Sequence, residues 1–177
     1  MELQAIFWYD LLMKKVYLVE GVSGAGKTTV CEELSKLGYK TIDGDEELAS
    51  FVDPETGLPT DDHSYRNWRW NEEKFDNALE QAGEGIIFVC GGAMNKPDFM
   101  HHFTKVFTLH IDDETLKHRL LNRTNNDYGK KSDELAFQLR MNQQTVQHSK
   151  ENGTILIETT KPLHTVIDEI LSWIDSQ

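Results

Sequence analysis

Apolar runs of strand length alternate along the chain with longer segments that have helical periodicity. This alternation predicts an α/β fold, in which helices cover a parallel sheet. Five runs have the composition of buried strands, at residues 15–20, 39–43, 86–90, 105–111 and 154–158. The segments between and after them predict helices at residues 26–37, 65–82, 95–103, 114–123, 133–150 and 163–174.

Two stretches lack such a pattern. Residues 44–63 contain the breakers Pro54, Gly57 and Pro59 and are expected to be irregular, with Ser64 as the cap of the following helix. Residues 122–132 are polar and loop-like. We find no repeat or interdomain linker. One domain is therefore expected over residues 13–177, preceded by an extension, residues 1–12, of unknown role.

The first strand and helix are joined by the pattern G-x-x-x-x-G-K-[ST], which holds phosphates in this setting. The glycines let successive N–H groups converge on phosphate oxygens, and the helix N-terminus adds positive potential. The lysine supplies a charge for the β- and γ-phosphates, and the threonine hydroxyl ligates Mg²⁺. The expected nucleotide contacts are Gly21, Ser23, Gly24, Ala25, Gly26, Lys27, Thr28 and Thr29.

The amino-acid composition limits the kinds of molecule that the protein is expected to bind. The formal net charge of the 177 residues is −12, so the long-range field repels nucleic acid and anionic membranes. The few cations must then be concentrated where a phosphate binds. No apolar run is long enough to span a bilayer, and the N-terminus is a poor signal peptide, so a cytoplasmic location is expected. Cys31 and Cys90 lack metal-ligand spacing and are expected to be small core residues.

Two carboxylates, Asp43 and Asp45, flank Gly44 at the end of the second predicted strand. The carboxyl ends of parallel strands line the ligand crevice. One carboxylate can hold Mg²⁺ through water, and the other can accept a proton from an acceptor hydroxyl. The alternative is a solvated turn in which Asp45 caps the next segment.

Together, the phosphate loop, the D-x-D turn and the Gly91–Gly92 pair resemble the shikimate kinase and gluconate kinase group of nucleoside monophosphate kinase-like P-loop kinases. The stretch from Gly57 to Asp62, followed by Arg66 and Trp68, is similar to a gluconate kinase segment. The resemblance implies a P-loop NTPase fold, a five-stranded sheet in the order 2-3-1-4-5 and a lid at about residues 122–132. It also implies that Asp43 lies near Mg²⁺, that Asp45 contacts the acceptor hydroxyl, and that Gly91 and Gly92 approach the acceptor. Ala93 stands where shikimate kinases carry a third glycine, and Tyr65–Arg66 replaces their Phe-Arg pair, so the resemblance leaves the acceptor open.

Arginines supply the remaining candidate contacts. Arg66 and Arg69, three apart on one predicted helix, would share a side and form an anion or sugar clamp; the alternative is a pair of surface arginines. Arg119 and Arg123, four apart, resemble the arginines at the entry of the kinase lid, which stabilise the transferring group; Arg119 would also contact the nucleotide. Arg140 is similar to the arginine that follows the lid and is expected to bind the acceptor. The alternative for these three is the ordinary preference for cations near a helix C-terminus.

These features predict a kinase that depends on ATP and Mg²⁺ and transfers the γ-phosphoryl group to a hydroxyl or phosphate of a small molecule. The chain has no N/T-K-x-D guanine motif, as a switch GTPase would, and its third strand ends in Cys90 and two glycines rather than in the acidic pair of an AAA-type motor. The alternatives are a nucleoside or nucleoside monophosphate kinase, and an ATP-binding regulatory protein without activity. A monomer or homodimer is expected.

Overall fold

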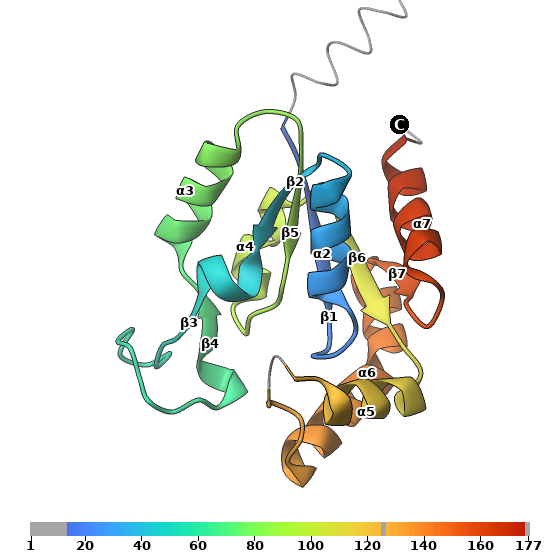
Figure 1. Ribbon diagram of the computed structural model, residues 1–177. Coiled ribbons are helices and arrows are strands. Elements are labelled where there is room, and N and C mark those ends of the chain that lie inside the picture. The colour runs from blue at the N-terminus through green and yellow to red at the C-terminus, as the bar shows by residue number, and fades with distance from the viewer. Residues whose placement is uncertain (1–13, 125–126, 176–177) are drawn as a thin grey trace, which may run out of the picture.

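A five-stranded parallel sheet forms the centre of the molecule (Figure 1). The computed structural model describes residues 14–124 and 127–175. The strands follow the order β2-β5-β1-β6-β7, which confirms the order 2-3-1-4-5 expected from sequence. Their bounds are β1 Lys15–Gly21, β2 Lys40–Asp43, β5 Ile86–Cys90, β6 Lys105–His110 and β7 Ile155–Glu158.

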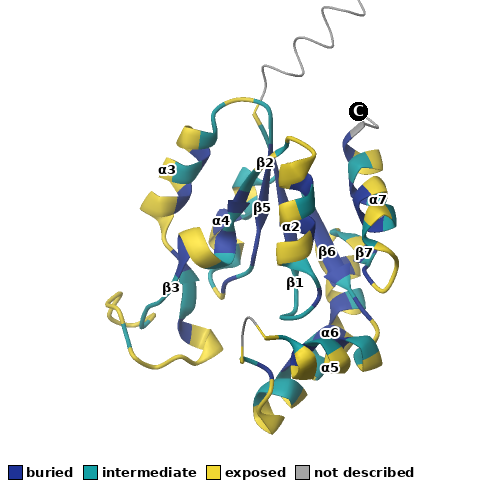
Figure 2. Ribbon diagram, in the orientation of Figure 1, coloured by how far each residue is buried: buried dark blue, intermediate teal, exposed yellow. Residues whose placement is uncertain are grey.

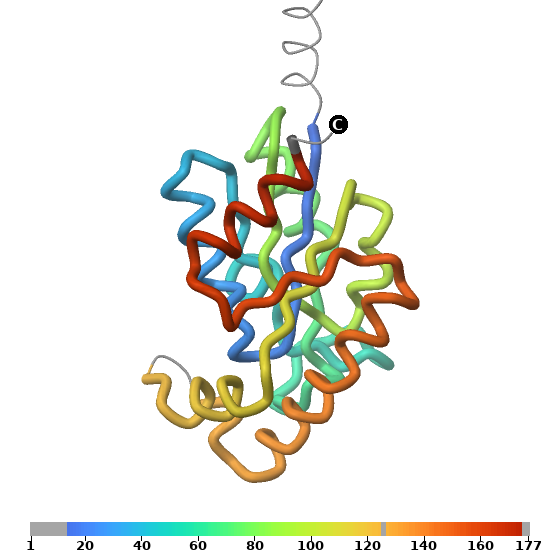
Figure 3. Tube along the Cα trace, turned by 90° about the vertical axis from the view of Figure 1, so that its right-hand side faces the viewer, coloured from blue at the N-terminus to red at the C-terminus, as the bar shows by residue number. Residues whose placement is uncertain are grey.

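Helices cover both faces of this sheet. Helices α2 (Lys27–Lys36) and α7 (Leu163–Asp175) pack on one face, and α3 (Glu72–Ala82) packs on the other with the short helix α4 (Lys96–Phe99), which continues as η3 (Met100–His102). Helix α5 (Asp113–Asn122) and the start of α6 (Ser132–Asn152) lie below the loop that joins β1 to α2, and the rest of α6 rises beside β6 and β7 (Figure 3). The sheet is therefore covered on both faces, with α5 and the start of α6 near the carboxyl ends of its strands.

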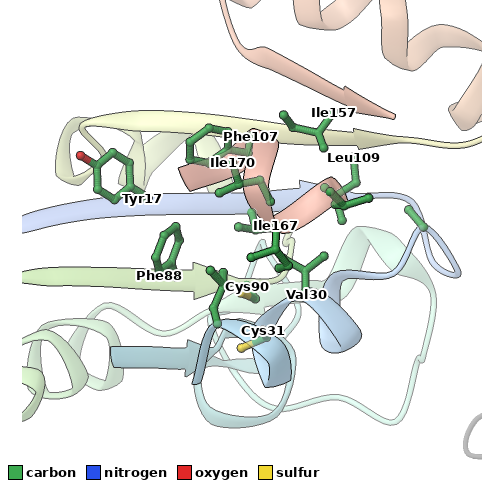
Figure 4. Packing of buried hydrophobic residues seen from close by; sticks show 14 of the residues in the cluster. Tyr17, Val30, Cys31, Phe88, Cys90, Phe107, Leu109, Ile157, Ile167 and Ile170 are labelled. Carbon is green, nitrogen blue, oxygen red and sulfur yellow. The ribbon is translucent and has the colours of Figure 1, made fainter. Parts of the chain in front are cut away.

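The central strand β1 shows why this arrangement is stable. Its side chains alternate, with Tyr17 and Val19 in the core beneath α2 and α7, and Val16 and Leu18 in the core beneath α3 and α4. Because both faces are covered, four successive residues of the strand, 16–19, are buried, and all four are largely apolar (Figure 2 colours the sheet by burial). Figure 4 shows the first of these cores, to which the buried, free Cys31 and Cys90 belong, as expected from sequence.

Strand register determines which loops meet. Val19 of β1 is paired with Cys90 of β5, and Cys90 is paired with Asp43 of β2, so these three residues form a row across the sheet. In each strand the row is followed by a motif singled out from sequence. The phosphate loop, the turn at 43–45 and the pair Gly91–Gly92 therefore lie at one edge of the sheet.

The helix predicted over residues 65–82 is wrong in its first half. Tyr65–Asn67 form a single 3₁₀ turn, η2, and Trp68–Trp70 form a strand, β4, paired antiparallel with β3 (Ala49–Phe51). Ser64 makes no side-chain cap hydrogen bond. Helix α3 instead begins after Asn71, whose side chain accepts a hydrogen bond from the Lys74 amide.

The segment 44–63, expected to be irregular, is partly ordered. It begins with a π-helical turn, η1 (Gly44–Leu48), and continues into β3. A single turn of π-helix is uncommon and is frequently found at functional sites. The rest of the segment is the loop between β3 and β4, which contains an isolated bridge between Val52 and Pro59.

The remaining boundaries agree with the pattern, with one consequence for the predicted lid. Helix α5 ends at Asn122, and Arg123 has extended backbone angles (φ −67°, ψ 148°). Arg119 and Arg123 therefore do not lie on one helix face. The extension at residues 1–12, and residues 125–126 within the lid at 122–132, lie outside the described residues. None of the helices in the described residues is long and apolar enough to cross a membrane.

Candidate active site

The phosphate loop has the geometry of an anion site. Gly26 precedes α2 with φ 106°, a left-handed conformation that favours glycine, and the helix begins at Lys27. The ammonium of Lys27 folds back over the loop and donates to the carbonyl oxygens of Gly21 (3.0 Å) and Val22 (3.4 Å). The loop, the helix N-terminus and a largely buried lysine therefore converge on one point, as phosphate binding requires.

One amide of this loop already has a partner that sequence reasoning missed. The Ser23 N–H donates to the side-chain oxygen of Gln138 at 2.8 Å, and the Gln138 amide group donates in turn to the hydroxyl of Tyr128 (3.3 Å). Gln138 is buried on α6, 115 residues away along the chain. No local pattern indicates such a contact, because it depends on how α6 crosses the end of the sheet.

Asp45 links the phosphate loop to the end of β5. One carboxylate oxygen lies 3.9 Å from the Lys27 ammonium, and the other accepts a hydrogen bond from the Gly92 amide at 3.1 Å. The side chain is 40% exposed, so it is open to a ligand. The structure therefore brings together three residues that sequence analysis had singled out separately.

Close backbone approach makes this arrangement possible. A Cβ on Gly91 would lie 2.9 Å from the backbone of Gly44 and 3.0 Å from the Asp45 nitrogen, so the two turns touch where only glycine fits. On the other side, the buried indole N–H of Trp70 donates to the Gly44 carbonyl at 2.8 Å. Trp70 is thus a core residue that holds the turn carrying Asp45.

Asp43 faces a second cavity of about 420 Å³, whose lining it shares with Thr28 and Glu46. Asp43 Oδ1 accepts hydrogen bonds from the amides of Asp45 (2.9 Å) and Glu46 (3.0 Å), which form the start of η1. A hydroxyl and carboxylates are the ligands that Mg²⁺ prefers, and Mg²⁺ commonly takes only one or two protein ligands beside phosphates and waters. The described residues contain no cluster of three or more His, Cys, Asp or Glu able to hold a metal.

A larger cavity, of about 930 Å³, opens beside Asp45. Its walls come from the phosphate loop, the β3–β4 hairpin, the segment from Gly92 to Met100, and α6. Its lining includes Glu20, a carboxylate that is 13% exposed, pairs with the ammonium of Lys96 and accepts a hydrogen bond from the Thr108 hydroxyl at 2.8 Å. Neither Glu20 nor Lys96 was singled out from sequence, since each lies in an otherwise ordinary strand end or helix start.

The predicted arginines are placed differently from what their spacing suggested. None of the described residues that line the large cavity is an arginine. Arg66 is exposed on η2, Arg69 lies on β4 opposite Ser50, and Arg140 is exposed on α6, over the ring of Phe137. The predicted shared side of Arg66 and Arg69 is wrong, because the two residues do not belong to one helix.

The two arginines of the predicted lid entry contact backbone. Arg119 donates to the Thr159 carbonyl at 3.0 Å and lies 3.5 Å from the carbonyl oxygens of Gly24 and Ala25, so it ties the phosphate loop to the segment after β7. Arg123 donates to the Tyr128 carbonyl. Partial burial lowers the pKa of Arg123, while the nearby carboxylates of Asp127 and Glu134 oppose that shift. Their action on a nucleotide stays a prediction.

Tyr65 lies where the hairpin meets α6. Desolvation, followed by the negative charges of Asp45 and Glu20, raises the pKa of its phenol to about 12. The phenol is therefore neutral at physiological pH and available as a hydrogen-bond donor beside Asp45.

Comparison with known proteins agrees with this geometry. A family model described as an AAA domain matches residues 18–160, which is most of the chain. The chain therefore belongs to this family, whose match spans the phosphate loop and the strands around it. A search of curated proteins found no match.

Three solved structures to which the fold of this chain is similar are described as kinases that act on small molecules. A sugar kinase from Janibacter sp. HTCC2649 is 20% identical, with a TM-score of 0.58 over 92% of this chain and 95% of that one. Shikimate kinase from Acinetobacter baumannii, in complex with shikimate, is 18% identical, with a TM-score of 0.56 and coverage of 96% and 97%. Deoxyadenosine kinase from M. mycoides, with bound dATP, is 18% identical, with a TM-score of 0.51 and coverage of 91% and 100%. The resemblance to nucleoside monophosphate kinase-like P-loop kinases is thus confirmed as a likeness of fold, and three different acceptors share that fold.

Proposed function

We propose that this protein is a phosphotransferase that depends on ATP and Mg²⁺ and moves the γ-phosphoryl group to a hydroxyl of a small molecule. The position of Asp45 carries the proposal. Its carboxylate lies beside the lysine of the phosphate loop on one side and at the opening of a 930 Å³ cavity on the other. A group in that place can contact an acceptor and the transferring phosphoryl group together.

The transfer balances as a direct displacement. The acceptor oxygen forms a bond to the γ-phosphorus, and the bond between that phosphorus and the β–γ bridging oxygen breaks, so ADP leaves with the electron pair. Asp45 accepts the hydroxyl proton, and Lys27 neutralises charge on the phosphates. Thr28 and Asp43 would hold Mg²⁺, which supplies further neutralisation of phosphate charge when bound.

The fold of the neighbouring kinases supports this assignment, and the contacts of Arg119 add to it. Arg119 joins Gly24 and Ala25 of the phosphate loop to the Thr159 carbonyl, which keeps the nucleotide-binding elements in one position. An ordered phosphate site reduces the reorganisation needed at the moment of transfer.

The test is release of ADP from ATP with a panel of hydroxyl-bearing acceptors, with Lys27→Ala as the blank. We expect one class of acceptor to raise turnover well above the rate with water alone. We expect Asp45→Asn to lower kcat by about 100-fold or more while ATP affinity stays close to that of the wild type, because loss of a general base costs about 10²–10⁴-fold.

The same two variants separate a kinase from an ATP-binding regulator. If ATP binds and requires Lys27, yet no acceptor stimulates turnover and Asp45→Asn changes nothing, the protein binds nucleotide without transferring it. That result would refute the proposed function.

A further inference from the structure

The charges that line the large cavity are already paired. Three lysines reach it within the described residues, and each lies next to a carboxylate that lines the same cavity. The separations are 3.9 Å and 3.5 Å in two pairs, and the third pair is in direct contact. The pairs are Lys27–Asp45, Lys131–Glu134 and Lys96–Glu20.

An anionic acceptor would therefore meet only cations that already have a carboxylate beside them, and of these only Lys131, which is 78% exposed in a weak surface pair, could turn toward it at little cost. Lys27 is committed to the nucleotide phosphates, and separating Lys96 from the largely buried Glu20 would leave a carboxylate without its ion-pair partner, which is costly. The described residues that line the cavity include none of the arginines predicted to bind the acceptor, Arg66, Arg69 and Arg140. This charge balance selects against a carboxylate or phosphate on the acceptor.

Aromatic rings occupy the walls instead. Phe51 stacks on His63, with ring centroids 4.4 Å apart and planes at 12°, and packs against Trp68 at 4.7 Å. From α6, Phe137 meets Tyr65 at 6.0 Å, so rings line the cavity from both the hairpin and the helix. His63 already covers one face of Phe51, and rings that line a cavity can stack on flat π-systems through the faces that remain, whatever the substituents on those systems.

The part of the cavity between α6 and strands β6 and β7 is lined mainly by hydroxyl and amide groups, beside His148 and next to the carboxylate of Glu20. Here α6 contributes Thr145, Ser149 and Asn152, and the sheet edge contributes Thr108 and Thr154, whose hydroxyls lie 2.7 Å apart. Hydroxyl and amide groups can bond the edge of a heterocycle or sugar hydroxyls without requiring a charge. A volume of 930 Å³ is at the upper end of the range for small-molecule sites.

We infer that the acceptor is an uncharged molecule that joins a flat heterocyclic ring to a hydroxyl, of the chemical class of nucleosides. The inference rests on the proposed function for the transfer itself, and on the ring-lined, charge-paired cavity for the identity of the acceptor. The ring lies among Phe51, Trp68 and Phe137, and the hydroxyl points to Asp45.

A panel that varies ring and charge separately tests the inference. The panel has four arms. Nucleosides carry an aromatic heterocycle and are neutral, and nucleoside 5′-monophosphates carry one and are anionic. Gluconate and shikimate have no aromatic ring and are anionic, and ribose has no aromatic ring and is neutral. Turnover is measured as ADP release, and binding is measured by equilibrium dialysis with labelled compounds. We expect kcat/KM to be highest for one or more nucleosides, by at least tenfold over every other arm.

Substitution of one wall residue ties the preference to the cavity. In Trp68→Leu we expect KM for the nucleoside to rise about tenfold, as loss of one stacking partner predicts, with KM for ATP unchanged. Trp173→Leu is the matched control, because Trp173 is exposed on α7 and does not line the cavity. Should Trp68→Leu not fold, Phe137→Ala on α6 provides the same test.

The outcomes separate the inference from the proposed function. Turnover that is highest with a monophosphate, a sugar acid, shikimate or ribose overturns the inference and upholds a kinase. If no compound is turned over, but nucleosides bind with an affinity that Trp68→Leu weakens and Trp173→Leu does not, transfer fails and the assigned occupant stands. Absence of both turnover and nucleoside binding overturns both.

Discussion

Gly91→Ala adds one methyl group at the contact between two turns of the site. In the structure, that carbon would lie 2.9 Å from the Gly44 backbone, whereas ordinary contacts begin at 3.4 Å. The atoms in the way are backbone, which cannot rotate aside as a side chain can. The turn at 43–45 or the end of β5 must therefore move, and Asp45 moves with it.

The expected losses of stability and activity in Gly91→Ala follow from this geometry. Overpacking of this kind costs about 1–3 kcal/mol of unfolding free energy. For a chain of this size, such a loss lowers Tm by roughly 2–12 °C. Displacement of a catalytic group by about 1 Å lowers activity by about 100-fold, so kcat/KM should fall far more than the stability loss alone would cause.

Gly92→Ala is the matched control. A Cβ on Gly92 has no neighbour closer than the Tyr65 hydroxyl at 4.0 Å, and neither glycine has a positive φ. Thermal unfolding and ADP release should therefore show a lower Tm and a much lower kcat/KM in Gly91→Ala, and Gly92→Ala should show little change in Tm. Equal Tm values for the two variants, or full activity in Gly91→Ala, would refute the claim that backbone contact positions Asp45.

Two further predictions concern Gln138 and Tyr65. Gln138→Leu removes the side-chain oxygen that accepts a hydrogen bond from the Ser23 amide, so ATP phosphates no longer compete with Gln138 for that amide. Because a hydrogen bond is worth about 1 kcal/mol, Kd for ATP measured by calorimetry should fall about fivefold. Gln143 lies on the same helix but donates a hydrogen bond to Asp113, so the control variant Gln143→Leu should leave Kd for ATP unchanged. Weaker ATP binding in Gln138→Leu would instead show that Gln138 supports the phosphate loop. Because the pKa of Tyr65 is about 12 when folded and about 10 when unfolded, its contribution to stability is complete below pH 10 and is lost as pH rises toward 12. Denaturant titrations at a series of alkaline pH values should show a smaller loss of stability in Tyr65→Phe than in the wild type, and identical losses would contradict the raised pKa.

The error at residues 65–82 shows where pattern reading stops. The sequence Trp-Arg-Trp alternates like a strand, but it directly precedes a strongly helical segment, and helical spacing accounts for both. What decides the outcome is a partner strand, Ala49–Phe51, in a stretch expected to be irregular, and a cap at Asn71 rather than Ser64. The helix that was to place Arg66 and Arg69 on one side does not exist, and the action of the two arginines on an acceptor stays a prediction.

The sequence by itself determined the α/β class, the strand order of the sheet through a family resemblance, and the phosphate loop, because these depend on local periodicity and on a motif whose residues are contiguous. It also selected Asp45 and Gly92, which the sheet register brings together. Only the tertiary structure revealed Gln138 on the phosphate loop, the pairing of Lys96 with Glu20, and the ring-lined cavity. These contacts join residues far apart in the chain, and the packing of α6 and the hairpin at the end of the sheet decides them, which no local pattern encodes.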